Sequence, residues 1–268
     1  MIPVSVIVVT KNEEKKLSTC LDALSGFSQV IVVDSASQDK TADIAKRDGV
    51  DFVNFIWSRQ YPKKRQWCLD NLDLRHDWVL FVDADEIVTD GLKDELTELF
   101  SKEPEHCGYF IKSRYVMNGK ILRHGLQNKK LVLFDKTRVE FPLVDDLDIP
   151  GMGEIEGHYQ PIIKAGANDC SIGELKSYFI HDALDDQRAW EFRHHKYARW
   201  EQGMNEKNAW PEDPKLFRNC AKKMLRHSRF HPQLVYFISY ILLFGFLDGR
   251  EGRKFAKMKK DYYALINK

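Results

Sequence analysis

Two aspartates one residue apart are the residues of this chain best suited to metal chemistry. Asp83 and Asp85 follow the apolar run Trp78–Val82, which is typical of a buried, parallel strand. Because side chains alternate along an extended chain, both carboxylates are expected to point the same way. Two hard oxygen ligands suit a Mg²⁺ or Mn²⁺ ion that also holds a phosphate. The alternative is a polar turn or a helix cap, where aspartate is also common.

Two earlier apolar runs also end in a polar residue. Pro3–Thr10 and Val30–Asp34 are rich in β-branched residues and are predicted to be buried strands. Strands that alternate with helical patterns indicate βαβ units and a parallel sheet. Right-handed crossovers then bring Thr10, Asp34 and Asp83 to one edge of the sheet, where open α/β sheets bind ligands. Three polar strand ends at one edge are what a nucleotide site requires.

The pattern of elements changes along the chain. Helices are predicted at 40–47, 63–71 and 91–100, and a short strand at 50–57. Further on, the chain favours strands at 109–116 and 131–134, a hairpin turn at Asn118-Gly119, glycine- and proline-rich loops over 141–173, and a polar helix over 182–208.

The cysteines and the start of the chain bear on the compartment. The five cysteines are scattered, odd in number and without CxxC spacing. That pattern argues against a zinc site or a disulfide framework and fits a reducing cytoplasm. Met1–Val4 enters a strand at once, so no secretory signal is expected.

Charge is distributed unevenly. From Lys215 onward the chain has 13 Lys and Arg against three acids, a net charge of +10, so residues 1–214 carry −9. Within this tail, Leu234–Leu247 is a 14-residue apolar run with bases on both sides. Such a run is shorter than the roughly 20 residues that span a bilayer. It suits an interfacial membrane contact, with a buried core helix or a dimer contact as the alternative.

Five landmarks together resemble a bacterial family 2 glycosyltransferase with the GT-A fold. The resemblance is specific over most of the first 100 residues, and the nearest subgroup builds lipopolysaccharide core or exopolysaccharide. It implies a Rossmann-like, mostly parallel α/β sheet with a C-terminal helical extension. It also implies inverting transfer of a sugar from a nucleotide-diphospho-sugar to a hydroxyl of a glycan or lipid-linked acceptor, assisted by Mg²⁺ or Mn²⁺. The landmarks are Val6–Glu14, Val32–Thr41, Lys64–Gln66, Phe81–Glu86 and Phe246–Gly252.

The resemblance also assigns roles to individual residues. Four of these residues also have a purely structural alternative: Asn12 and Asp39 could be helix caps, Arg65 could form a surface salt bridge, and His181 could be a structural histidine. Lys129 and Lys130 are further candidates for a diphosphate or an anionic acceptor. Thr10 and either Glu13 or Glu14 are expected to bind the base and ribose, and Asp34 is expected to bind the nucleoside. Arg65 is assigned to the diphosphate and Asp83 to the nucleotide. Asp85 together with Asp83 is assigned to the metal, and His181 to the metal or the diphosphate.

Inverting transfer also requires a base that removes the proton of the acceptor hydroxyl. Related enzymes often place a His-Glu pair beyond the Asp-x-Asp strand, and this chain lacks that adjacent pair. Residues 150–159 offer Glu154 at the matching place, with Glu156 and Asp146 as alternatives.

Three regions are expected: a nucleotide-sugar-binding GT-A half at 1–135, an acceptor-binding and catalytic-base region at 136–214, and a basic, apolar helical tail at 215–268 whose composition makes it a candidate for membrane contact. The expected location is cytoplasmic and peripheral on the inner face of the cell membrane, and an oligomer is compatible with it. One alternative is a nucleotidyltransferase acting on a sugar phosphate, which the absence of glycine from Thr10–Lys16 disfavours. The other is a non-enzymatic protein that binds anions or nucleic acid through its basic tail. The chain has no recognisable nucleic-acid motif and its body is acidic, so no nucleic-acid partner is expected.

Overall fold

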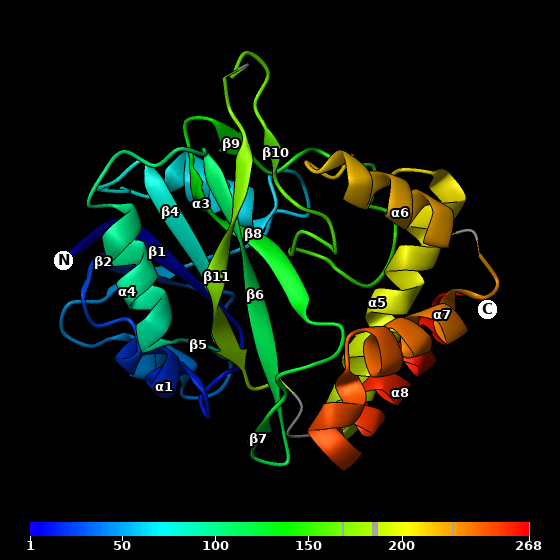
Figure 1. The fold of residues 1–268 in the computed structure, drawn as a ribbon. Coiled ribbons are helices and arrows are strands. Elements are labelled where there is room, and N and C mark those ends of the chain that lie inside the picture. Colours follow the sequence, from blue (N-terminus) through cyan, green and yellow to red (C-terminus); the bar gives the residue numbers. More distant parts are fainter. Residues whose placement is uncertain (168, 184–186, 227, 268) are drawn as a thin grey trace. The chain divides into compact units, whose positions relative to one another are not determined.

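The computed structural model describes residues 1–167, 169–183, 187–226 and 228–267. The chain forms two compact units. The first, here called the sheet unit, comprises residues 1–113, 129–141 and 160–181. The second, the helical unit, comprises residues 114–128, 142–159 and 182–268. Figure 1 follows the chain through its elements in order.

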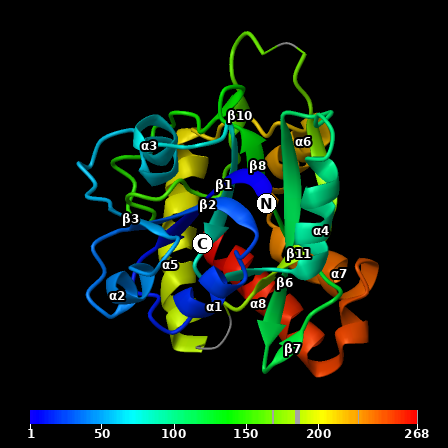
Figure 2. The same ribbon diagram turned by 90° about the vertical axis from the view of Figure 1, so that its left-hand side faces the viewer.

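A mixed, mostly parallel set of strands carries the sequence landmarks. The sheet order is β3-β2-β1-β4-β8-β6-β11-β5. The first four strands in this order are parallel, whereas β8 runs antiparallel to β4 and β5 antiparallel to β11. Figure 2 shows β1 beside β2. The strands are β1 Ile2–Thr10, β2 Phe27–Asp34, β3 Asp51–Asn54, β4 Trp78–Asp83, β5 Glu86–Val88, β6 Gly108–Met117, β8 Asn128–Asp135 and β11 Ile172–His181.

The register places the polar strand ends together, as predicted. Thr10 pairs with Asp34 across β1 and β2, and Val9 pairs with Asp83 across β1 and β4. The apolar residues before them are buried because helices and loops cover both faces, which is why these strands are continuous apolar runs. The covering helices of this unit are α1 Leu17–Asp22, α2 Thr41–Ala45, α3 Lys64–Asn71 and α4 Asp90–Leu99.

The helical unit contains the rest of the helices, of which α7 and α8 pack together (Figure 1). Trp200 of α5 is fully buried and donates through Nε1 to Asp146 at 2.9 Å. Its ring requires a glycine at Gly157, because a Cβ there would lie 2.2 Å from the indole. The helices are α5 Gln187–Lys207, α6 Leu216–Arg226, α7 His231–Phe237 and α8 Gly249–Ile266, with a π-helical stretch Ile238–Leu242 and a 3₁₀ turn Gly245–Asp248 between the last two.

Most predicted elements are confirmed within a few residues. The hairpin turn joins β6 to β7 (Lys120–Ile121), with Asn118 and Gly119 at φ 51° and 74°, as a type I′ turn requires. The predicted loop region 141–173 also holds the short strand β10 (Ile162–Ile163), which pairs with β9 (Val139–Glu140). The helix predicted over 182–208 is described from Gln187, and residues 184–186 of that prediction lie outside the described residues.

The cysteine pattern argues against a disulfide framework, but the structure contains a disulfide bond. Cys107 and Cys170 form a disulfide, with Cα atoms 5.6 Å apart. They are 63 residues apart in sequence, and the fold places Cys107, just before β6, beside Ser171, just before β11.

The core of the sheet unit depends on the aromatic ring of Phe81. This side chain is 1 % exposed and packs against Phe134 and Phe141, with centroids 6.0 and 5.7 Å away. We expect Phe81→Ala to lower the free energy of unfolding by about 3–5 kcal/mol, measured by urea denaturation. Ile56→Ala, at a site 80 % exposed, should change it by less than ~0.5 kcal/mol. Equal midpoints for the two variants would contradict this packing.

Candidate active site

The carboxylate of Asp83, at the end of β4, is held by two cations. Oδ1 accepts from the Arg65 guanidinium at 3.0 Å, and Oδ2 accepts from Lys130 Nζ at 2.7 Å. Lys130 also donates to Glu86 at 2.8 Å, and the buried Glu86 carboxylate accepts from the Ser113 hydroxyl. All five side chains belong to the sheet unit. They form one network of two carboxylates, two cations and a hydroxyl.

This network fixes the charge state of its members. Burial alone raises the pKa of Asp83, but the ammonium of Lys130 and the guanidinium of Arg65 hold that pKa well below its usual range. Burial likewise opposes the charge on Lys130, and the Asp83 and Glu86 carboxylates outweigh it and raise the lysine's pKa. Asp83 and Lys130 are therefore both charged at neutral pH.

Asp85 has a different partner. It lies in the turn between β4 and β5, outside the strand, so the alternation that predicted its direction does not apply to it. Its Oδ2 lies 3.3 Å from Nε2 of His181, which ends β11 and pairs in register with Glu86. Burial raises the pKa of Asp85, but the His181 imidazole outweighs this and lowers it overall. Asp85 and His181, both predicted to bind a metal, therefore lie side by side, and the metal role predicted for them and for Asp83 stays a prediction.

Asp85 and His181 fit a divalent cation as part of its shell. No three His, Cys, Asp or Glu side chains of the described residues form a group that could hold an ion alone. A carboxylate and an imidazole side by side are donors that Mn²⁺ accepts. Mg²⁺ and similar ions at phosphate sites commonly take one or two protein ligands and fill the remaining positions with substrate oxygens and water. The residues present therefore fit an ion that arrives with a diphosphate.

Thr10 and Asp34, which end β1 and β2, lie at the same edge of the sheet. Asp34 is 2 % exposed and accepts from the backbone N–H of Ser37 at 2.8 Å and from its hydroxyl. Lys64 Nζ donates to the carbonyl of Thr10 at 3.0 Å. The hydroxyl of Thr10 is buried, and no described residue hydrogen-bonds it. A buried, unsatisfied hydroxyl is costly and marks a position where a ligand would supply the missing partner.

Three residues of the loop that follows β1 bind the segment that follows β2. Asn12 is not a helix cap: its Oδ1 accepts from Gln38 N at 2.8 Å, whereas α1 begins at Leu17. Glu14 Oε2 accepts from Lys40 N, and the backbone N–H of Glu13 donates to Thr41 Oγ1 at 2.7 Å. These contacts position the loops, and nucleotide binding by Glu13 or Glu14 stays a prediction.

Other predictions resolve differently. Asp39 precedes the N-cap position of α2, which is Lys40, and its carboxylate accepts from the N–H of Thr41 at 3.0 Å. Arg65 is not a surface ion pair, since its side chain is 17 % exposed. Lys130 and Glu86 belong to the hydrogen-bonded network around Asp83. The sequence predicts no role for Glu86, and for Lys130 it predicts only contact with a diphosphate or an anionic acceptor. The only sequence signal was the Lys129-Lys130 pair before a strand.

The base candidates lie in the helical unit. Glu156 is 2 % exposed, Glu154 is partly exposed, and Asp146 is buried against Trp200. The structure also forms a His–Glu pair that the sequence hides: His158 Nδ1 lies 2.6 Å from Glu201 Oε1, which also accepts from Tyr262. The two residues are 43 positions apart, so no local motif reveals them. The assignment of Glu154 or Glu156 as base stays a prediction.

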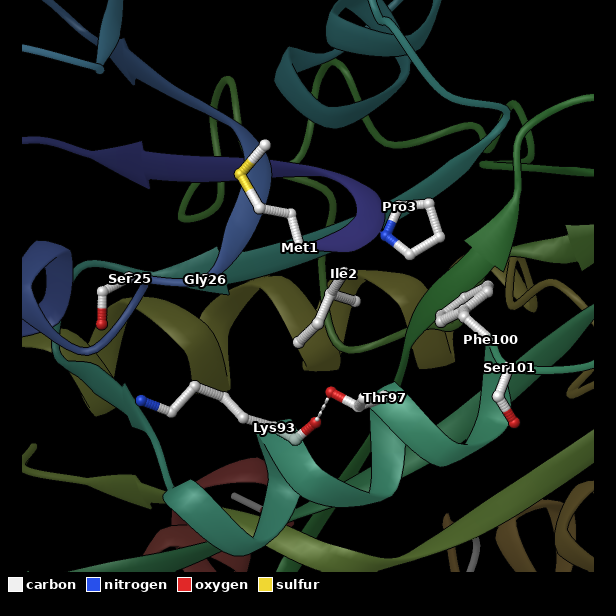
Figure 3. A pocket seen from close by; sticks show the side chains of 9 residues that line it. All are labelled: Met1, Ile2, Pro3, Ser25, Gly26, Lys93, Thr97, Phe100 and Ser101. Atoms are coloured by element: carbon white, nitrogen blue, oxygen red, sulfur yellow. Dashed lines mark hydrogen bonds between the residues drawn. The ribbon is translucent and has the colours of Figure 1, made fainter.

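A separate pocket of ≈ 480 Å³ opens in the sheet unit (Figure 3). Its lining comes from the start of β1, the end of the α1–β2 turn and one face of α4, including Ile2, Lys93 and Phe100. Since β1 and β4 are parallel, this pocket lies at the edge opposite Asp83. None of the predicted site residues lines it.

Removing Lys130 tests the charge network. We expect Lys130→Met to lower the free energy of unfolding at pH 7 by about 3 kcal/mol, because Asp83 and Glu86 lose their shared cation. In the wild type, the stabilisation from Asp83 is complete above the unfolded pKa of about 3.9 and is lost only as pH falls through the depressed folded pKa. In the variant the pKa of Asp83 should rise, so lowering the pH from 7 toward 5 should narrow the gap between the two proteins.

The measurement is urea denaturation across this pH range. Lys129→Met is the matched control, because its ion pair with Glu174 is about 40 % exposed on both sides and should contribute less than ~1 kcal/mol. A stability gap for Lys130→Met that stays constant with pH would contradict the charge assignment.

Comparisons with known proteins agree with this fold. An uncharacterized glycosyltransferase of Rickettsia typhi is 30 % identical over 146 residues, covering 52 % of this chain and 48 % of that protein. The lipopolysaccharide core biosynthesis glycosyltransferase LpsC of Rhizobium meliloti is 28 % identical over 122 residues, covering 44 % of each chain. The chain thus spans about half the length of these relatives.

Among solved structures, the mannosyltransferase PcManGT from Pyrobaculum calidifontis, in complex with GDP-Man and Mn²⁺, superposes with a TM-score of 0.53 at 14 % identity. The match covers 98 % of this chain and 85 % of that one and shows a shared GT-A fold. Residues 5–153 match the family described as Glycosyl transferase family 2, which is more than half of the sequence. The chain therefore belongs to glycosyltransferase family 2.

Proposed function

We propose that the chain transfers a sugar from a nucleotide-diphospho-sugar to a hydroxyl of a glycan or lipid-linked acceptor, with inversion at the sugar carbon. The observation that carries this proposal is the edge at which Asp83, bound by Arg65 and Lys130, adjoins the Asp85–His181 pair. It brings acidic ligands for a cation and basic partners for phosphates to the end of the same strand.

In this proposal different residues bind different parts of the nucleotide-sugar donor. Thr10 and Asp34 bind the nucleoside. The buried Thr10 hydroxyl either donates a hydrogen bond to the ligand or accepts one from it. Asp85 and His181 hold a Mg²⁺ or Mn²⁺ ion, which when bound neutralises charge on the leaving diphosphate. Arg65 supplies the guanidinium that contacts the diphosphate, because its planar N–H donors suit phosphate oxygens.

The acceptor part of the proposal rests on relatives. LpsC is named for lipopolysaccharide core biosynthesis, which supports a hydroxyl of a core oligosaccharide or related polysaccharide as the acceptor. The bound GDP-Man and Mn²⁺ of the mannosyltransferase support a nucleotide sugar and a divalent ion as donor and cofactor. We place the enzyme at the cytoplasmic face of the membrane, where its basic tail meets anionic lipid.

Asp85→Asn tests the cation site. Removing the carboxylate that holds the ion should lower turnover roughly 10²–10³-fold in an assay of sugar transfer or donor hydrolysis with a panel of nucleotide sugars. Calorimetric titration should also show weaker Mn²⁺ binding in the presence of the matching nucleoside diphosphate. Asp48→Asn, at an exposed position outside the site, is the control and should behave as wild type. Wild-type turnover by Asp85→Asn would remove the cation from this position.

Two substitutions separate the base candidates. Glu154→Gln should lower kcat roughly 10²–10⁴-fold with little change in donor KM, since Glu154 is partly exposed and can meet an acceptor hydroxyl. Glu156→Gln should mainly lower thermal stability, because its side chain is buried. If Glu156→Gln loses turnover and keeps its stability while Glu154→Gln remains active, the two roles are exchanged.

A further inference from the structure

The helical unit presents an apolar surface where the chain turns between α7 and α8. Six apolar side chains on this turn are each at least 40 % exposed. Exposed apolar residues that stand alone are ordinary, whereas a contiguous group of this kind marks an interaction site. We call residues 241–247 the apolar tip; its exposed members are Ile241, Leu242, Leu243, Phe244, Phe246 and Leu247.

The backbone of the apolar tip is firmly held from inside. Gly125 N donates to Leu243 O at 2.8 Å, and Leu126 N donates to Ser239 Oγ at 3.0 Å. Asp248, 3 % exposed, accepts from His124 N at 2.7 Å just after the tip. These bonds satisfy the turn on its inner side and leave the apolar side chains on its outer side. The exposure is thus a property of an ordered turn.

Helix α8 places positive charge next to this tip. Arg250, Arg253, Lys254 and Lys257 follow one another at positions i, i+3, i+4 and i+7 and are all exposed, while Phe255 on the other face is buried. We call these four residues the basic stripe. It begins three residues after Leu247 and extends about 10 Å along the helix. Within the part of the chain that the structure describes, none of the four forms a side-chain ion pair or hydrogen bond.

The other basic helix of this unit differs in that respect. Lys222 and Arg218 of α6 bind the buried Asp213 at 2.7 and 3.2 Å, and the Arg226 guanidinium stacks on Trp210 at 3.7 Å. Although α6 also exposes apolar side chains such as Phe217, its cations are committed to partners within the unit. The cations of the basic stripe, by contrast, face solvent.

We propose that the apolar tip and the basic stripe together bind the surface of an anionic bilayer. The tip's side chains lie at the boundary between headgroups and acyl chains, and the stripe lies against headgroup phosphates. An apolar element beside cations is the composition that binds such interfaces. The proposal narrows membrane contact from residues 215–268 to these two features, and it does not depend on the sugar-transfer reaction.

The charges favour a contact at the interface over a crossing of the bilayer. No single described helix is long and apolar enough to cross a membrane. The pair His231–Leu242 and Gly245–Ile266 meets the length and composition requirements only when taken together, with a 70° bend between them. The second member carries the basic stripe, and cations in the hydrocarbon core are costly. In a headgroup layer the same cations are favourable.

The test is flotation of the full chain with vesicles of phosphatidylcholine, with and without phosphatidylglycerol. Wild-type protein should float only with the anionic vesicles. Leu242→Gln with Leu247→Gln should weaken binding at least tenfold, because two apolar side chains stay in water. Arg253→Gln with Lys254→Gln should weaken it roughly 30-fold and flatten its salt dependence. All four positions are exposed, so circular dichroism and the melting temperature should match the wild type.

The controls change composition equally at other sites. Ile56→Gln with Leu143→Gln removes two exposed apolar side chains, and Lys102→Gln with Lys176→Gln removes two exposed charges; both pairs should bind as wild type. Phe217→Gln on α6 should also leave binding unchanged. Absence of flotation by the wild type, equal losses in controls and tip variants, or loss only in Phe217→Gln would overturn the proposal.

Two further measurements separate other occupants of the surface. Sedimentation velocity should show the same mass for the wild type and the tip variant. A wild-type dimer that Leu242→Gln with Leu247→Gln dissociates would assign the tip to a second copy and overturn the lipid assignment. Bound protein should also be released by alkaline carbonate, and resistance to extraction would overturn the interfacial arrangement.

Discussion

The site of this enzyme depends on the salt bridges that surround Asp83. A carboxylate at the end of a buried strand is unfavourable without partners, and here Arg65 and Lys130 supply them at 3.0 and 2.7 Å. These cations come from α3 and from the start of β8, so the charge pairing links segments distant in sequence. Lys130 also neutralises Glu86, which brings β5 into the same network. The interactions that satisfy buried charge therefore also assemble the edge of the sheet.

The parallel strands bring the candidate site residues together at that edge. Because β1, β2 and β4 end in register, Thr10, Asp34 and Asp83 are aligned without any special loop. β11 then approaches through its pairing with β5 and delivers His181 to Asp85. The two aspartates therefore have different partners. Asp83 binds the cations Arg65 and Lys130, whereas Asp85 lies beside the His181 imidazole, with which it could bind a metal ion.

The sequence predicted what local patterns encode. Apolar runs located β1, β2 and β4, and the polar residues after them located the edge at which Thr10, Asp34 and Asp83 meet, because strand burial and strand ends leave a direct signature. Contacts made across the fold left none. Lys130 meets Glu86 over 44 positions, His158 meets Glu201 over 43, and Cys107 meets Cys170 over 63. Each of these pairings is set by which strands and helices become neighbours. The alternation argument for the direction of the Asp85 side chain does not hold, because β4 ends two residues before Asp85.

We propose that the carboxyl edge of this sheet binds a nucleoside diphosphate together with a divalent ion. The decisive measurement is a crystal structure with Mn²⁺ and the nucleoside diphosphate that the protein binds most tightly. We predict the nucleoside beside Thr10 and Asp34, and the ion between Asp85 and the diphosphate. Nucleotide bound at the opposite edge, in the pocket beside Lys93 and Phe100, or an ion held away from Asp85, would contradict it.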